Sequence, residues 1–151
     1  MSRSGYTDED YDGQLAMWRG QVANSIRGKR GQKMLRDLLT ALDSMPEKQL
    51  ISGHLENSEG VCALGALGQY RHIDMSNCEK LIDIYGYCED FEMLAELLSK
   101  AFDITPQLAR EIQYLNDEFY DFTWEDGKRR NYTPEERWQK MRAWVQSKIK
   151  E

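Results

Sequence analysis

The stretch from Ser25 to Lys33, SIRGKRGQK, brings four cationic side chains and two glycines together in a chain whose net charge is −6. Cations beside the amides of a helix N-terminus bind phosphate groups. The glycine spacing is not that of a nucleotide-binding P-loop, and GKRG is expected to follow a helix rather than a strand. The segment therefore predicts an isolated phosphate or nucleic-acid contact, and the alternative is a solvated turn between two helices. The candidate contacts are Arg27, Lys29, Arg30, Lys33 and Arg36.

His54 and Cys62 lie on either side of the turn-like segment ENSEG. A cysteine paired with a histidine acts as a nucleophile in several enzyme classes. Cys62, however, lies in the apolar run VCALGAL, where a thiol behaves as a small hydrophobic side chain. No third residue that would orient the histidine is evident. A thiol-dependent enzyme is therefore the least supported hypothesis, and no catalytic residue is predicted.

Acidic and aromatic side chains are interleaved between residues 117 and 126. The acids lack the regular spacing and the glycine of an EF-hand loop, so no metal site is predicted. Aromatic side chains ringed by charge are typical of protein-binding surfaces. The alternative is that the aromatics are buried, or that the acids meet the basic segments of this same chain. The candidate protein-binding residues are Glu89, Asp90, Glu92, Asp117, Glu118, Phe119, Tyr120, Asp121 and Trp124.

The charges are segregated along the chain. When Lys and Arg are counted against Asp and Glu, residues 19–36 carry +6, residues 74–126 carry −11 and residues 127–151 carry +5. Such blocks produce oppositely charged faces only if the fold keeps them apart. Pairing of the blocks within the chain is the alternative.

The elements that must position these groups are mostly helices. Apolar residues recur at helical spacing over four segments, which are residues 14–27, about 35–44, 77–85 and 90–101. Gly28 separates the first two of them, so the basic stretch is expected to lie at an interhelical turn.

Threonine followed by proline marks two further helix starts. Thr105 caps one of them, and Thr133 caps the last helix together with Glu136 in a capping box. Short apolar runs on either side of a turn predict a β-hairpin around residues 50–62. Residues 116–131 form the longest stretch without a clear period.

These patterns together predict a mainly α fold, in which residues 1–151 form a single-domain multi-helix bundle with a polar segment at residues 1–10. Three cysteines without a CxxC pair indicate neither a disulfide framework nor a zinc site, and no cofactor is predicted. No apolar run approaches the length of a membrane span and no export signal is visible. No membrane partner is therefore predicted, and the expected location is the cytoplasm.

Five strings, SRSGY, IRGKRGQ, VCALGALG, AREIQYLNDE and TPEERWQKMRAWV, occur in this order along the chain. In this combination the chain resembles a family of small uncharacterised proteins carried by bacteriophages and prophages. The resemblance covers most of the chain, whereas residues 69–100 are longer and richer in acids than the family's pattern. The family has no established activity. The resemblance therefore implies a context, the cytoplasm of a bacterial host cell, and transfers no catalytic residue.

The leading hypothesis is a non-enzymatic protein that acts by protein–protein interaction, as an inhibitor of a host or anti-phage defence complex. It rests on the missing catalytic set, on the acidic and aromatic block, and on the resemblance to small phage proteins, many of which bind host components. The alternatives are an accessory protein that binds nucleic acid or phosphate through residues 27–36 and, with least support, the thiol-dependent enzyme.

Overall fold

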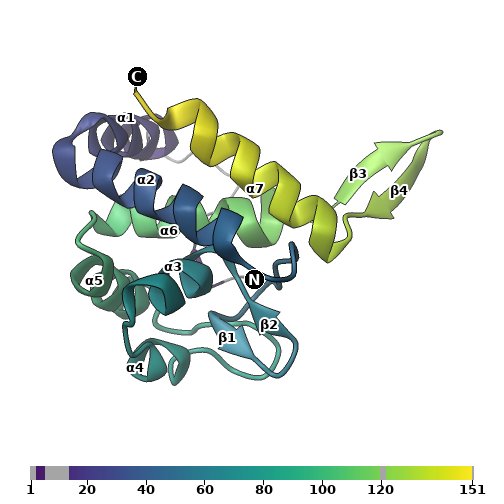
Figure 1. Cartoon of the computed structure of the whole chain (residues 1–151), viewed down its shortest axis with the longest axis horizontal. Helices are drawn as coiled ribbons and strands as arrows, with labels where there is room; N and C mark the ends of the chain where they lie inside the picture. The colour runs from purple at the N-terminus through teal and green to yellow at the C-terminus, as the bar shows by residue number, and fades with distance from the viewer. Residues whose placement is uncertain (1–2, 6–13, 120–121, 151) are drawn as a thin grey trace.

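The structure, a computed structural model, describes residues 3–5, 14–119 and 122–150. These residues form seven α-helices, a short π-helix and two β-hairpins (Figure 1), which confirms the predicted mainly α fold. The helices are α1 (Gln14–Arg27), α2 (Lys29–Ser44), α3 (Ala63–Arg71), α4 (Ser76–Glu79), α5 (Phe91–Phe102), α6 (Pro106–Tyr114), the π-helix (Leu115–Phe119) and α7 (Pro134–Lys148). The strands are β1 (Glu56–Asn57), β2 (Gly60–Val61), β3 (Phe122–Glu125) and β4 (Lys128–Asn131).

The two threonine–proline pairs begin helices as predicted. Thr105 Oγ1 accepts a hydrogen bond from the Leu108 amide at 3.2 Å, and the proline after it is the first residue of α6. Thr133 Oγ1 accepts from the Glu136 amide, while Glu136 Oε1 accepts from the Thr133 amide, each at 3.1 Å. This capping box fixes the start of α7, because it satisfies amides that have no partner within the helix.

The predicted helix over residues 77–85 is wrong beyond its first turn, since α4 ends at Glu79. The Asp83 carboxylate accepts hydrogen bonds from the amides of Tyr85 at 2.8 Å and Tyr87 at 3.1 Å. Gly86 has a φ of 80°, in the left-handed region that favours glycine. An aspartate that bonds the amides following it competes with the helix, so the chain turns at Asp83.

The first predicted hairpin is present as the antiparallel strands β1 and β2. The loop before it lies against the start of α3, where the Cys62 amide donates to the Leu55 carbonyl at 3.1 Å. Gly65 permits this contact, because a Cβ at this position would lie 1.9 Å from the Leu55 oxygen. The glycine thus lets Leu55 lie close to α3.

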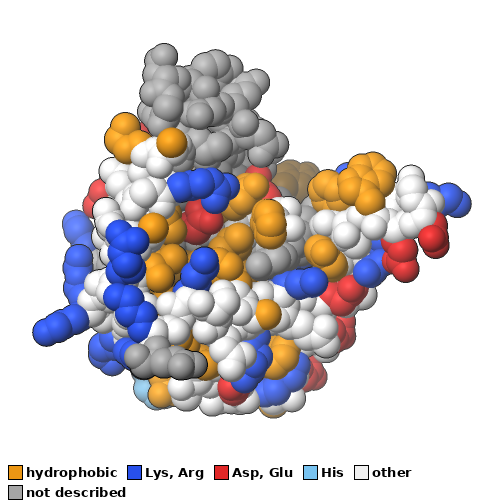
Figure 2. Space-filling model, turned by 90° about the horizontal axis from the view of Figure 1, so that it is seen from above, with side chains coloured by type: hydrophobic (Ala, Val, Ile, Leu, Met, Phe, Trp, Pro, Cys, Tyr) orange, Lys and Arg blue, Asp and Glu red, His pale blue; other side chains and the backbone are white. Residues whose placement is uncertain are grey.

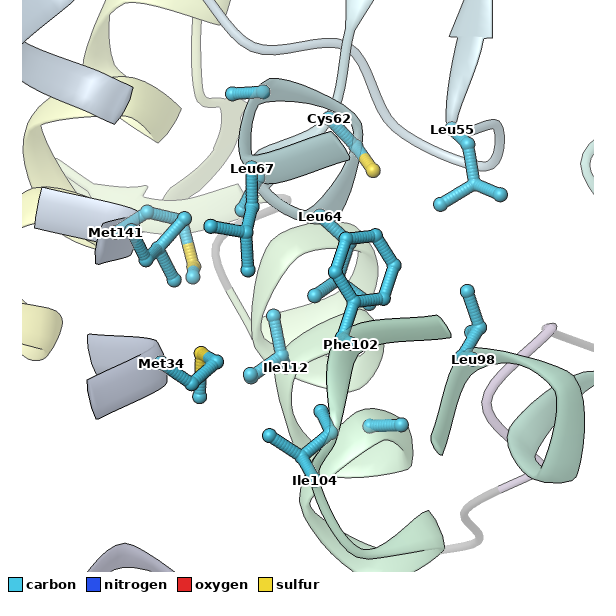
Figure 3. Close-up of a cluster of buried hydrophobic side chains, with 14 of the residues drawn as sticks. Met34, Leu55, Cys62, Leu64, Leu67, Leu98, Phe102, Ile104, Ile112 and Met141 are labelled. Atoms are coloured by element: carbon cyan, nitrogen blue, oxygen red, sulfur yellow. The ribbon is translucent and has the colours of Figure 1, made fainter. Parts of the chain in front are cut away.

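The hydrophobic core lies between α2, α3, α5, α6 and α7. Figure 3 shows side chains from all five helices meeting there, namely Met34, Leu67, Phe102, Ile112 and Met141, and each of them is fully buried. Burying one such side chain stabilises a fold by about 1.5–3 kcal/mol. The bundle is therefore a stable scaffold for the elements on its surface. Among the described helices, none combines the length and apolar composition needed to cross a bilayer.

The second hairpin, β3 and β4, projects from the bundle beyond the start of α7 (Figure 1). It occupies part of the stretch for which the sequence predicted no regular structure. Its strands are antiparallel, with Trp124 opposite Arg129 and Phe122 opposite Asn131. The turn between them is Asp126–Gly127, and both residues have positive φ, 53° and 74°. This is the conformation that an Asp-Gly pair adopts in tight hairpins.

Candidate functional site

One face of the β3–β4 hairpin carries aromatic side chains and an arginine. Residues opposite each other in an antiparallel pair share a face, so Phe122, Trp124 and Arg129 lie on the same side. The rings of Phe122 and Trp124 are arranged edge to face, with their centroids 6.2 Å apart. The Arg129 guanidinium lies 4.2 Å from the ring centroid of Phe122. Trp124 remains 68% exposed. We call these three residues the hairpin face.

The opposite side of the hairpin is joined to the bundle by an ion pair. Arg130 lies 2.6 Å from the Glu125 carboxylate and forms a two-bond pair with Glu136 of α7, at 2.7 and 3.0 Å. The hydrogen bonds from Arg130 and from the Thr133 amide lower the pKa of Glu136 to about 2. Glu136 therefore belongs both to the capping box of α7 and to the attachment of the hairpin.

Figure 2 shows the same division on the surface. Hydrophobic side chains lie along one side of the projecting hairpin, on the right of the view, whereas basic side chains lie at its tip and acidic ones along its other edge. The hairpin thus presents a mixed surface of apolar and charged groups.

The structure divides the predicted protein-binding residues among different places. Trp124 lies on the hairpin face, and Phe119 is exposed at the end of the π-helix. Asp117 and Glu118 turn toward the N-terminal residues instead: Asp117 pairs with Arg3 at 2.6 Å, and Glu118 accepts from the Ser4 hydroxyl. Tyr120 and Asp121 lie outside the described residues.

The other predicted acids lie at the start of α5. Asp90 caps this helix by accepting from the Met93 amide at 3.1 Å, and Glu89 and Glu92 are exposed beside it. Figure 1 places α5 on the side of the bundle away from the hairpin. The acidic block of the sequence is therefore not one continuous surface in the fold.

The five basic candidates surround the start of α2, and for four of them a partner is found among the described residues. Arg30 pairs with Asp103 and Lys33 with Asp37, each at 3.2 Å. Arg36 donates to the Lys150 carbonyl at 3.3 Å, and Arg27 donates to the Asn24 side chain. Lys29 lines a hollow of about 440 Å³ between the first turns of α2 and α6. The hollow adjoins two helix N-termini, whose dipoles favour an anion.

Cys62 and His54 have different partners. Cys62 is 1% exposed and caps α3, since its sulfur accepts from the Gly65 amide at 3.4 Å. His54 Nδ1 lies 2.6 Å from a carboxylate oxygen of Glu79. The other two cysteines, Cys78 and Cys88, are also buried, and burial raises the pKa of both thiols. Within the described part of the chain, no three His, Cys, Asp or Glu side chains are grouped as metal ligands.

The contribution of Phe122 and Arg129 was not predicted from the sequence. The signal was present as Asp126–Gly127 between runs of aromatic and charged residues, because this dipeptide favours a two-residue hairpin turn. The turn sets the strand register, and the register places Trp124 beside Arg129. In comparisons with protein-family models, curated proteins and solved structures, no match to this chain was found.

Proposed function

We propose that this chain is a small non-enzymatic binding protein that holds a partner protein through the hairpin face and acts in the cytoplasm of a bacterial host. The observation that carries the proposal is the exposure of Trp124 on a hairpin whose other side is joined to α7. Large apolar side chains grouped on a projecting surface mark interaction sites.

The chemistry of the hairpin face suits a protein interface. Tryptophan and arginine are the residues most enriched among those that dominate binding energy. Attachment of Arg130 to Glu136 holds the hairpin in place before binding. A surface that is already ordered loses less conformational entropy when a partner binds.

The charge around the hairpin favours a protein over a nucleic acid. Glu125 and Asp126 stand beside Lys128 and Arg129 in the same ten-residue segment, and the whole chain carries −6. A polyanion is bound by a continuous positive field, whereas charges of both signs give specificity toward a protein surface. The expected partner surface therefore combines an apolar pocket with charges of both signs.

Inhibition of a host or anti-phage defence complex is the role that we propose for this binding. It is supported by the resemblance to small phage proteins, which is an argument from association rather than from geometry. The binding proposal itself does not depend on it.

Site-specific cross-linking tests the proposal directly. We would place p-benzoylphenylalanine at Trp124 in one variant and at Tyr85 in a matched control, because Tyr85 is 87% exposed on the turn after α4. In host cells irradiated with ultraviolet light, position 124 is expected to give a discrete cross-linked protein that position 85 does not. Equal cross-linking from both positions, or none from position 124, would refute the hairpin as the interface.

Nucleic-acid or phosphate binding at the start of α2 is the second candidate, and the hollow beside Lys29 is the observation that favours it. An electrophoretic mobility assay with DNA and RNA at low salt separates the two proposals. Retardation that weakens steeply with salt and that disappears on substituting Lys29 and Arg30 by alanine would favour the second candidate, because neutralised phosphates release counterions. No retardation is expected if the hairpin proposal is correct.

A further inference from the structure

The carboxylate of Asp117 in the π-helix binds the guanidinium group of Arg3. Its Oδ2 lies 2.6 Å from Nε of Arg3, and its Oδ1 lies 3.0 Å from Nη2. Two parallel bonds of this kind distinguish arginine from lysine, because only the planar guanidinium presents paired donors. Arg3 is fully buried in this position.

The Asp117 carboxylate is held in its orientation by groups other than Arg3. Asp117 Oδ1 also accepts from the Gly53 amide at 3.0 Å and from the Asn116 side-chain amide at 2.8 Å. Asn116 is itself fixed, since it accepts from the Ala63 amide at 3.1 Å and donates to the Ile51 carbonyl at 2.9 Å. The carboxylate therefore remains oriented when the arginine leaves, which is the property of a preorganised site.

The two residues after Arg3 also have specific contacts. The Ser4 hydroxyl donates to Glu118 at 3.1 Å, and the Ser4 carbonyl accepts from Arg110 Nε at 2.7 Å. Gly5 has a φ of 73° and lies against the ring of Phe91, so closely that a Cβ would approach a ring carbon to 2.3 Å. These contacts thus fit three successive residues: an arginine, a small polar residue and a glycine.

The pairing of Arg3 and Asp117 suits recognition better than stabilisation. Burial by itself lowers the pKa of Arg3, but Asp117 and then Cys62 raise it above its ordinary value, so the group stays charged. Removing a full charge from water is costly, so a buried pair of this kind contributes less stability than apolar packing would.

We propose that these contacts form a recognition site for an arginine-bearing peptide segment, filled in cis by residues 3–5, and that such a segment of a partner protein can replace them. Residues 3–5 belong to no helix or strand. The groups that contact them lie on α5, on α6 and on the π-helix. Exchange of the occupant therefore breaks no secondary structure. The site is separate from the hairpin face, and its failure would leave the hairpin proposal intact.

Peptide binding to full-length variants tests the proposal. The probe is a fluorescent peptide of sequence SRSGY, compared with one in which lysine replaces the arginine. Arg3→Ala weakens the binding of residues 3–5 in cis, so the arginine peptide is expected to bind this variant about tenfold more tightly than it binds the wild type. The lysine peptide is expected to bind the R3A variant about tenfold more weakly than the arginine peptide does. The double variant R3A/D117N is expected to lose binding. Arg142→Ala is the matched control, because it removes an arginine–aspartate pair on the surface, with Asp43.

A second measurement covers the case in which R3A does not fold. Propylguanidinium chloride, a fragment of the arginine side chain, is then expected to restore the circular-dichroism signal at millimolar concentration, relative to equal sodium chloride. The wild type is expected to gain nothing. A folded R3A that binds neither peptide, or both equally, would overturn the proposal, as would an unfolded R3A that propylguanidinium does not restore. Arg3 would then be only a structural clamp.

Discussion

The guanidinium of Arg130 and the carboxylate of Glu136 form a two-bond pair, with Nη1–Oε1 at 2.7 Å and Nη2–Oε2 at 3.0 Å. This pair joins β4 to the first turn of α7, across the connection that carries the Thr133 cap. A single carboxylate thus stabilises a helix start and orients the hairpin that we propose as the binding surface.

The first prediction concerns the pH dependence of stability. The pKa of Glu136 is lowered from 4.5 to about 2 in the folded state. The contribution of ionised Glu136 to the free energy of unfolding is therefore present above pH 4.5 and is lost as the pH falls toward 2. Glu136→Gln is therefore expected to lower the free energy of unfolding at pH 7 and to flatten its decline between pH 4.5 and 2. Urea unfolding at a series of pH values measures both effects. Glu135→Gln is the control, because it removes the same charge from the same helical turn. Equal slopes in E136Q and E135Q would contradict the assignment.

Two glycines in the first two helices are expected to respond in opposite ways to alanine. A Cβ at Gly31 would lie 1.9 Å from the Ser25 carbonyl oxygen, so G31A should force α1 and α2 apart and cost about 1–3 kcal/mol. Among the described residues, no atom outside the backbone of α1 lies within 4 Å of a Cβ at Gly20, so G20A should stabilise the fold by about 0.5–1 kcal/mol. Thermal melts of the two variants give the comparison. If G31A leaves the free energy of unfolding unchanged, the close approach of the two helices does not contribute to stability.

The third prediction separates binding from stability at the hairpin. Trp124→Ala removes a mostly exposed side chain, so the melting transition should change by no more than about 0.5 kcal/mol. Affinity for the cross-linked partner should fall by about 2 kcal/mol, or roughly thirtyfold in Kd. Calorimetric titration of the purified pair measures the loss, and Tyr85→Ala serves as the exposed aromatic control. Similar affinities of W124A and Y85A would remove Trp124 from the interface.

The fourth prediction concerns the thiols. Cys62, Cys78 and Cys88 are all buried, so iodoacetamide should leave them unmodified in the folded protein and alkylate them after unfolding in urea. Mass spectrometry of the two samples counts the modified residues. Rapid alkylation of Cys62 under native conditions would contradict this prediction and support the hypothesis of a thiol-dependent enzyme.

The sequence alone was sufficient for most of the helices, because their signals are local. The starts of α6 and α7 depend on Thr105 and Thr133, which bond amides three residues later. The Asp126–Gly127 turn is an equally local signal, although the irregular charge pattern around it concealed the hairpin. The Asp83 turn shows the opposite case, in which apolar periodicity suggested a helix and side-chain hydrogen bonds ended it.

Only the tertiary structure decided which charged groups are available to a partner. By sequence, Asp117 and Trp124 belong to one acidic and aromatic block, but Asp117 is bound to Arg3, 114 residues away, while Trp124 is exposed. No local pattern encodes this difference, because a contact over such a separation depends on how α6, the π-helix and the loop at Gly53 pack together. Periodicity and capping act within a few residues, so they determine the elements, whereas burial and charge pairing arise only once those elements have assembled.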